Sequence, residues 1–175
     1  LEIGCGWGGF AEYAARHIGC KVTGITISHE QLAFGQQRIH AAGLAHKVDL
    51  KYCDYRDVAQ QYDRVVSIEM FEAVGEKYWP VFFDKLKSSL KPGGQAGLQI
   101  ITIEDDRFDS YRKNTDFIQQ YIFPGGMLPS PSKIKEAVKA ANLQFCGQHN
   151  FASDYAETLA RWRKQFLDVW PDIQA

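Results

Sequence analysis

Residues 1–9 are Leu1-Glu2-Ile3-Gly4-Cys5-Gly6-Trp7-Gly8-Gly9, the pattern of a buried strand that runs into a glycine turn and then a helix. Without a Cβ atom at Gly4, Gly6 and Gly8, the backbone can turn sharply and a ligand can approach it closely. Glu2 lies at the tip of the strand, where its carboxylate can accept a hydrogen bond from a polar ligand. The stretch therefore predicts the ligand-binding turn of a Rossmann-like fold, with these four residues as binding candidates.

The rest of the chain alternates between segments with strand patterns and segments with helix patterns. Alternation of this kind predicts an α/β fold with a mostly parallel sheet and helices on both faces. We expect strands at residues 1–3, 20–26, 48–52, 62–69, 95–103 and 143–151, and helices at residues 8–18, 28–42, 79–90, 131–141 and 155–166. Residues 104–130 are charged, aromatic and rich in Pro and Gly without a clear period, so they predict a functional insertion after the fifth strand.

Length and composition limit the classes of function. A chain of 175 residues with 45% apolar residues is expected to form one domain, residues 1–175, around a substantial core. The net charge of −1 gives no basic excess, so binding to nucleic acid is not expected. The four cysteines lack the spacing of a disulfide framework or a zinc site, so no metal is expected.

The glycine turn alone does not identify the ligand, because Gly4, Gly6 and Gly9 also satisfy the G-x-G-x-x-G fingerprint of dinucleotide-binding folds. Two later segments favour another cofactor. Residues 62–67, Y-D-R-V-V-S, suggest a strand with an acidic corner, and residues 90–94, L-K-P-G-G, suggest a helix stop and a tight turn. The order and spacing of the three segments resemble the class I S-adenosylmethionine-dependent methyltransferases. This resemblance implies S-adenosylmethionine as cofactor and leaves a nicotinamide dehydrogenase as a distant alternative.

The segment after the second strand, Thr26-Ile27-Ser28-His29-Glu30-Gln31, lies where nucleotide-binding folds often place an acidic residue against the ribose. Ser28 and Gln31 form a capping-box pattern, which needs no ligand. Both roles are compatible, because a cap at the carboxyl edge of the sheet also faces the ligand crevice. We therefore expect Thr26, Ile27, Ser28 and Gln31 to line the cofactor site, with Thr26 and Gln31 at the ribose.

Two further loops at carboxyl ends of strands carry candidates. Asp54 and Tyr55 follow the third strand, where they can bond or stack against the adenine, or form a polar surface turn without a ligand. The fourth strand closes with Ile68, a further cofactor candidate, and is followed by Glu69 and Glu72 among apolar residues. Because a carboxylate in such surroundings is costly unless it is paired or hydrogen-bonded, these two glutamates favour a functional role.

Six segments together resemble the cyclopropane-fatty-acyl-phospholipid synthases over nearly the whole chain. They are G-C-G-W-G-G-F at residues 4–10, G-I-T-I-S-H-E-Q at 24–31, D-Y-R-D at 54–57, S-I-E-M-F-E-A-V-G at 67–75, F-I-Q-Q-Y-I-F-P-G-G-M-L-P-S at 117–130, and a closing stretch from His149 to Pro171. The segment at 117–130 is far more specific than the glycine turn. The chain opens inside a strand and lacks the final strand of the methyltransferase fold, so we expect a fragment truncated at both ends.

The resemblance implies a reaction in which the methyl of S-adenosylmethionine is attacked by a cis alkene in a phospholipid acyl chain. The resulting carbocation loses a proton and closes to a cyclopropane ring. A bound bicarbonate ion is the implied base, with Glu72, Gln99 and Ile101 as the catalytic residues around it. Gln99 falls where some family members have His, and an amide can donate a hydrogen bond but cannot take up a proton. The family also supplies an N-terminal Cys region and a C-terminal Tyr, neither of which lies within these 175 residues.

The implied substrate is an unsaturated phospholipid at the membrane surface, with the insertion as its cover. Tyr121, Phe123 and Trp162 are the substrate candidates, because aromatic faces can stabilise a passing cation. Core packing is the alternative for each of them. The resemblance further implies a cytoplasmic protein, peripheral to the inner membrane where it meets its substrate, with a homodimer as a candidate assembly.

Other functions on the same scaffold stay open. If the cation is not closed to a ring, the product is a methyl-branched or hydroxylated lipid. A small amine is another acceptor, because related N-methyltransferases share the F-P-G-G segment. A non-catalytic module that binds cofactor or lipid is the remaining alternative, which Glu2, Glu72 and the complete glycine turn disfavour.

Overall fold

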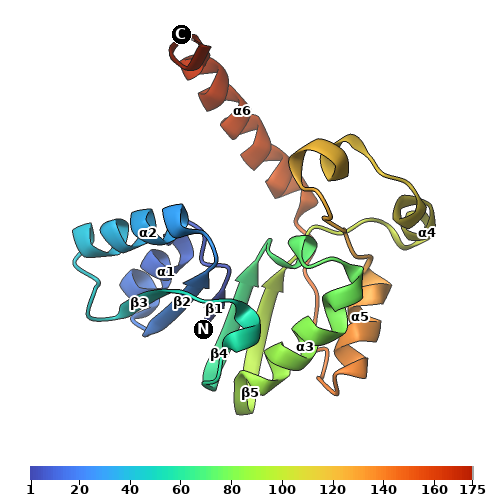
Figure 1. The fold of residues 1–175 in the computed structure, drawn as a ribbon, viewed down its shortest axis with the longest axis horizontal. Helices are drawn as coiled ribbons and strands as arrows, with labels where there is room; N and C mark the ends of the chain where they lie inside the picture. The colour runs from blue at the N-terminus through green and yellow to red at the C-terminus, as the bar shows by residue number, and fades with distance from the viewer. Residues whose placement is uncertain (175) are drawn as a thin grey trace. The chain divides into compact units, whose positions relative to one another are not determined.

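The computed structural model describes residues 1–174, which form two compact units with the boundary between Gln144 and Phe145. The first unit contains a five-stranded parallel sheet in the order β3-β2-β1-β4-β5 (Figure 1). The strands are β1 (Glu2–Ile3), β2 (Val22–Thr26), β3 (Val48–Tyr52), β4 (Tyr62–Ile68) and β5 (Leu90–Gln99). The strand order reverses between β1 and β4, so the carboxyl ends of these two strands border the crevice where such folds bind ligands.

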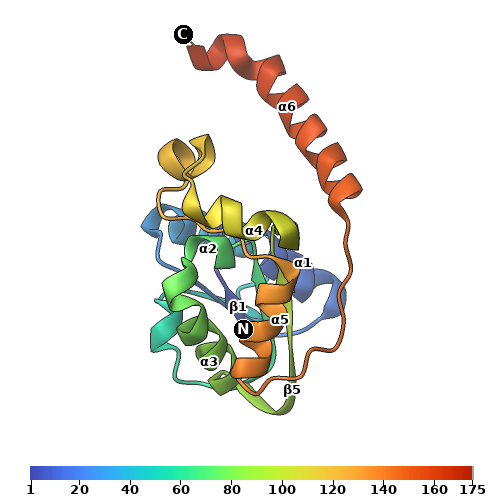
Figure 2. The same cartoon turned by 90° about the vertical axis from the view of Figure 1, so that its right-hand side faces the viewer.

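Helices cover both faces of the sheet, as the alternating pattern predicts. They are α1 (Gly9–Tyr13), α2 (His29–Ala41), α3 (Trp79–Ser88), α4 (Asp105–Lys113) and α5 (Pro131–Ala140). On one face Val22 and Leu50 pack with α1 and α2, and on the other Ile25 and Val65 pack with α3 and α5. Helices α3 and α5 lie side by side in both views (Figures 1 and 2).

The glycine turn meets α2 backbone to backbone. A Cβ atom added to Gly8 would lie 3.3 Å from the Cα atom of Gly35, and one added to Gly35 would lie 2.8 Å from Cδ1 of Leu50. The first distance is tighter than most real Cβ contacts, and the second requires the end of the Leu50 side chain to move, so glycine on both sides lets this seam close. The helix itself begins as predicted, because the Ser28 hydroxyl accepts a hydrogen bond from the Gln31 amide at 3.2 Å.

Strand β5 begins and ends earlier than the predicted range of 95–103. Leu90 already pairs with Tyr62, and regular pairing resumes where Gln95 meets Arg64. Residues 91–94 between them therefore form a bulge within the strand, with Gly93 at φ 76°, instead of a turn before it. Pro92 is compatible with this position, because proline has no N–H group and a residue in a bulge of an edge strand does not need to donate a hydrogen bond to the sheet.

The predicted sixth strand at residues 143–151 is wrong, because these residues form no strand. Helix α5 ends before Asn142, whose φ is 54°, and the chain then continues without regular pairing. The second unit, which starts at Phe145, consists mainly of the long helix α6 (Ala152–Gln174). The predicted final helix at 155–166 is therefore present but longer at both ends. The insertion, predicted without periodic structure, contains α4 and a π-helical turn at Ile118–Ile122.

Candidate functional site

The glycine turn has the backbone conformation that only glycine adopts without strain. Gly4, Gly6 and Gly8 have φ angles of 82°, 51° and 79°. The amides of Gly4 and Cys5 both donate to the carbonyl oxygen of Ile25, at 3.0 and 2.9 Å, which ties the turn to the end of β2. A Cβ atom on Gly4 would lie 2.8 Å from Cγ of Met70, whereas one on Gly6 would meet nothing within 4 Å. Gly6 therefore offers open space at the turn, where a ligand can approach the backbone.

Glu2 is a buried carboxylate in which one of the two oxygens makes no hydrogen bond within residues 1–174. Its side chain is 3% exposed, and its Oε2 atom has no hydrogen-bond partner among residues 1–174. Burial raises the pKa of Glu2 from 4.5 to about 8. A buried polar atom without a partner is costly, so this oxygen fits a hydrogen-bond donor brought by a ligand.

The residues predicted at the ribose form a small network. Thr26, at the end of β2, donates from its hydroxyl to Oε1 of Gln31 at 3.0 Å and accepts from the Ser28 amide at 3.1 Å. The side-chain carbonyl of Gln31 therefore does not complete the capping box. The Thr26 hydroxyl holds this side chain and so orients its NH2 group. Ile27, between these residues, is 67% exposed. The structure thus joins Thr26, Ser28 and Gln31 by hydrogen bonds at the carboxyl end of β2, with the exposed Ile27 between them in the chain.

The loop after β3 favours the surface-turn alternative. Asp54 accepts from the Arg56 guanidinium at 2.9 and 2.7 Å and also from the Arg56 amide. This hydrogen bonding with Arg56 lowers the pKa of Asp54. The Tyr55 ring packs edge-on against Phe82, with ring centroids 5.6 Å apart. Both side chains thus have protein partners, and their role at the adenine stays a prediction, as does that of the half-buried Ile68.

Two exposed aromatic pairs near the same edge were missed from the sequence. Trp7 in the glycine turn packs edge-on against Phe34 of α2, with centroids 5.4 Å apart. His29, the first residue of α2, stacks on Tyr52, the last residue of β3, with centroids 4.0 Å apart and an interplanar angle of 3°. Flat aromatic surface of this kind can border an adenine ring. The signal was the position of Trp7, His29 and Tyr52 next to a strand end or a helix start.

Glu69 and Glu72 each contact the end of β5. The Gln99 side-chain amide donates to Oε1 of Glu69 at 2.7 Å, and the Ile101 backbone amide donates to Oε1 of Glu72 at 2.6 Å. The Oε2 atom of Glu72 is buried without a partner among residues 1–174. Burial raises the pKa of Glu72, with a further contribution from the nearby charge of Glu69. The three predicted catalytic residues therefore share one edge of the sheet, with Glu69 as an additional member.

The insertion is docked at the same edge. The Met127 amide donates to the backbone carbonyl of Glu72 at 2.8 Å, and the Gln119 side chain donates to the Gly126 carbonyl at 3.2 Å. Gln119 and Asp116 also cap each other reciprocally through backbone amides at 3.1 and 2.8 Å. These contacts fix the segment between Asp116 and Met127 next to Glu72.

The fixed segment presents its apolar side chains outward. Within residues 117–123, which we call the apolar turn, Tyr121 is 65% and Phe123 64% exposed. Core packing, the alternative interpretation for these two residues, is therefore excluded within the described chain. Trp162 lies in α6 of the second unit and is 56% exposed, and its role at the substrate stays a prediction.

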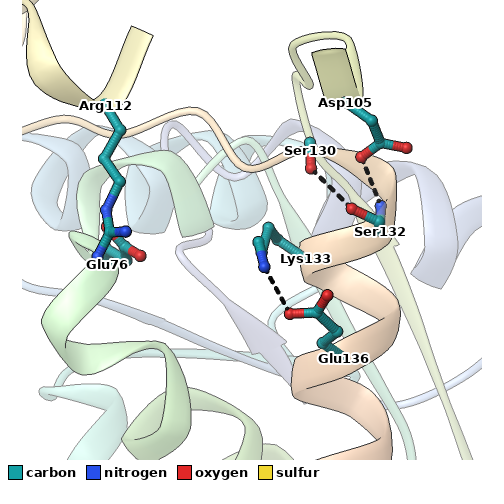
Figure 3. A network of polar contacts seen from close by, with 7 residues as sticks. All are labelled: Glu76, Asp105, Arg112, Ser130, Ser132, Lys133 and Glu136. Atoms are coloured by element: carbon teal, nitrogen blue, oxygen red, sulfur yellow. Dashed lines mark hydrogen bonds and ion pairs between the residues drawn. The ribbon is translucent and has the colours of Figure 1, made fainter. Parts of the chain in front are cut away.

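Helix α4 is anchored at both ends (Figure 3). At its start, Oδ1 of Asp105 accepts from the Ser132 backbone amide at 3.0 Å, in the first turn of α5, whose N-cap residue Ser130 makes no side-chain capping bond. At its last turn, the Arg112 guanidinium pairs with Glu76 at 2.7 Å. The insertion is thus attached to the rest of the first unit by polar contacts at both ends of α4, while its apolar turn stays exposed.

Two features are absent from residues 1–174. No helix in this part of the chain is long and apolar enough to cross a membrane. Its His, Cys, Asp and Glu side chains form no group of three that could hold a metal ion.

Comparison with known proteins places these features in context. The family model described as mycolic acid cyclopropane synthetase matches residues 1–175. The tuberculostearic acid methyltransferase UfaA1 of Mycobacterium tuberculosis is 43% identical over 168 residues, which cover 95% of this chain and 39% of that protein. The cyclopropane-fatty-acyl-phospholipid synthase of Escherichia coli K12 is 41% identical over 176 residues, which cover 99% and 43%. The chain therefore spans about two fifths of the length of these curated relatives.

A solved structure agrees with these sequence matches. The crystal structure of mycolic acid cyclopropane synthase CmaA1 complexed with SAH and CTAB superposes with a TM-score of 0.82 at 27% identity. The match covers 93% of this chain and 60% of that one. The sheet, its strand order and the glycine turn are thus those of a class I methyltransferase fold.

Proposed function

Since this chain belongs to the mycolic acid cyclopropane synthetase family, we propose that its protein transfers a methyl carbon from S-adenosylmethionine to a lipid. The acceptor is the cis double bond of an unsaturated phospholipid acyl chain, and the product is a cyclopropane fatty acid. The observation that carries the proposal is the hydrogen bond between the Met127 amide and the Glu72 carbonyl. It places the insertion with its exposed apolar turn beside the carboxylates of the sheet edge. The surface that suits an apolar substrate and the carboxylates that suit the reaction are then next to each other.

The first half of the site supports binding of the cofactor. S-adenosylmethionine, when bound, would supply an electrophilic methyl carbon. The open space at Gly6 lets a ligand lie against the backbone, and the unpartnered Oε2 atom of Glu2 can accept a hydrogen bond from it. Thr26 holds the Gln31 amide so that its NH2 group can donate to a hydroxyl oxygen. The residues present therefore fit the cofactor.

The second half supports the chemistry on the acyl chain. The π electrons of the alkene would form the new bond to the methyl carbon while the bond from that carbon to the sulfonium sulfur breaks. The sulfur keeps the electron pair and leaves as a neutral thioether, and a positive charge remains on the other alkene carbon. Loss of one methyl proton to a base returns an electron pair and closes the ring. The exposed aromatic rings of Tyr121 and Phe123 can stabilise the cation with their faces. Exclusion of water by the acyl chain strengthens that stabilisation.

Bicarbonate as the base is part of the proposal. Glu72 has a raised pKa and a buried Oε2 without a partner among residues 1–174, so its protonated form can donate to an anion. The amide of Ile101 is already engaged by Glu72, so Ile101 would contribute its carbonyl group. The second N–H of Gln99 can donate to the same anion.

A second candidate product is a methyl-branched lipid. Gln99 cannot take up a proton, and its amide is already bonded to Glu69. If proton removal from the methyl group is slow, the cation instead loses a proton from a neighbouring chain carbon to the base, which leaves a methyl-branched alkene. Alternatively it adds water and releases a proton, which leaves a methyl-branched alcohol. The related protein from Mycobacterium tuberculosis is named for a methyltransferase product of this type, tuberculostearic acid.

The test uses the full-length protein, unsaturated phospholipid vesicles and S-adenosylmethionine labelled on its methyl group, with mass spectrometry of the acyl chains. A labelled chain that gains one CH₂ as a ring is the expected result. Glu72→Gln keeps an acceptor for the Ile101 amide and a donor for the anion, so it should retain labelling. Glu72→Ala removes both, and we expect about 100-fold slower labelling. Label in an open branch selects the second candidate. Absence of lipid label despite measured cofactor binding overturns both.

A further inference from the structure

Glu69 has a backbone conformation that its residue type rarely adopts. Its φ angle is 50°, in the left-handed region that favours glycine. Asn142, the other non-glycine residue with positive φ among residues 1–174, has a simple explanation because it ends α5, where Asn is common in this conformation. Glu69 instead follows the last residue of β4 at the carboxyl edge of the sheet. Strain of this kind persists only where the surrounding structure enforces it, and it concentrates at functional sites.

Two hydrogen bonds show what the strained conformation achieves. The Glu69 amide donates to the backbone carbonyl of Gln99 at 2.9 Å, and the Gln99 side-chain amide donates to the Glu69 carboxylate at 2.7 Å. Gln99 is therefore held by the same residue through its main chain and its side chain. A carboxylate only accepts, so it fixes which end of the Gln99 amide is the NH2 group. The orientation of Gln99 is thus set by Glu69.

The left-handed turn also brings the next carboxylate into place. After Glu69 the chain enters a short helical turn at Phe71–Ala73, which contains Glu72. The two glutamates then contact alternate residues at the end of β5, Gln99 and Ile101. One N–H of the Gln99 amide is used by Glu69, and the second is directed elsewhere by the same fixed geometry.

We propose that Glu69 is a positioning residue for the reaction: it holds the Gln99 amide in one orientation beside Glu72, and this orientation governs how fast the cation loses its proton. The inference rests on the proposed function and adds to it a residue that controls the product. With the amide fixed, its second N–H holds the base next to the methyl group and ring closure is fast. With the amide free to rotate, proton loss slows and open-chain product accumulates.

Glycine and glutamine at position 69 separate this role from a structural one. Glu69→Gly relieves the left-handed strain but removes the side-chain acceptor, so a positioning role predicts lost turnover in a protein that folds at least as well. Glu69→Gln keeps an acceptor oxygen for Gln99 and is expected to rescue most of the activity. Asn142→Gly is the matched control, because it relieves the same kind of strain away from the site.

The experiment measures thermal midpoint, kcat, KM for S-adenosylmethionine and the ratio of ring to open-chain product in the full-length protein. For Glu69→Gly we expect an unchanged or higher midpoint, kcat lower by about tenfold, KM within about twofold, and a shift toward open-chain product. Glu69→Gln should stay within about threefold of the parent kcat. Asn142→Gly should match the parent in kcat and product ratio.

Parent-like turnover and product ratio in Glu69→Gly would overturn the inference, as would a lowered midpoint with unchanged kcat for the folded fraction. A parent protein that labels no lipid overturns the proposed function instead. In that case the side-chain amide protons of Gln99, followed by NMR, still decide the positioning claim. They should exchange slowly in the parent and rapidly in Glu69→Gly, and equal exchange in the two proteins contradicts it.

Discussion

The glycine turn and the apolar turn lie at the same edge of the sheet but are built in opposite ways. The glycine turn is defined by missing side chains: its backbone is packed against Met70 and Gly35, with no room for a Cβ atom at Gly4. The apolar turn is defined by side chains that are largely exposed, and it is held in place by polar contacts of Gln119. Substitutions in the first should therefore cost stability, while substitutions in the second should cost lipid turnover.

The largest effect on stability is expected from Gly4→Ala. The new methyl group would meet Met70 at 2.8 Å in a left-handed backbone, so we expect the free energy of unfolding to fall by about 2–5 kcal/mol. Gly6→Ala is the control, because it has the same backbone penalty but open space, and should cost only about 1–2 kcal/mol. Urea denaturation of the full-length protein measures both. Equal losses would mean that packing against Met70 does not shape the turn.

Glu2 gives the next largest effect, as a dependence of stability on pH. With a folded-state pKa of about 8, the folded protein keeps a proton that the unfolded chain has released, so stability falls as pH rises from about 4.5 to 8 and then levels off. We expect a loss of about 2–4 kcal/mol over this window. Glu2→Gln removes the titration and should flatten the curve, as measured by urea denaturation at several pH values. A parent curve that rises through this window contradicts the buried, protonated carboxyl.

Gln119→Ala tests how the apolar turn is held. It removes the reciprocal cap with Asp116 and the bond to the Gly126 carbonyl, so we expect a loss of about 1 kcal/mol. The same change should increase amide hydrogen exchange in residues 117–126 and leave residues 4–8 as protected as before. Gln61→Ala, which removes an exposed contact to Ser88, is the control. If exchange rises equally in both turns, the two regions are not independent.

The smallest effect on stability is expected from Tyr121→Ala combined with Phe123→Ala. Both side chains are nearly two-thirds exposed, so the free energy of unfolding should change by less than about 0.5 kcal/mol. Turnover on phospholipid vesicles should fall about tenfold, while cofactor binding measured by calorimetry stays unchanged. Phe108→Ala, which empties a buried position in α4, should instead lower the free energy of unfolding substantially. Full lipid turnover in the double variant would remove the apolar turn from the substrate path.

The parts of the fold that sequence reasoning found are those fixed by local chemistry. The positive φ angles at Gly4, Gly6 and Gly8 and the Ser28 cap each depend on residue type within a few positions. The early start of β5 depends on Leu90 meeting Tyr62, which no local pattern encodes. The strand expected at residues 143–151 failed for the same reason, because strand propensity becomes a strand only where a partner is available.

The candidate site likewise has features that the local sequence reveals and contacts between distant segments that it does not. The glutamates at 69 and 72 could be identified because charge among apolar residues at a strand end is unusual, but their contacts with Gln99 and Ile101 cross between strands. Helix α4 was missed because its apolar residues show little periodicity. Its acidic start at Asp105 and Asp106 and its basic end at Arg112 and Lys113 were the available signal.

The seam between the glycine turn and α2 constrains how this protein can change over generations. An alanine at Gly35 would reach Leu50, and any side chain at Gly8 would reach Gly35 itself. A search that alters one codon at a time should therefore favour glycine at position 35. Shortening Leu50 in the same gene opens space for Gly35→Ala, so the two positions should show strong epistasis. A library intended to vary the cofactor half of this scaffold should be randomised at these positions jointly.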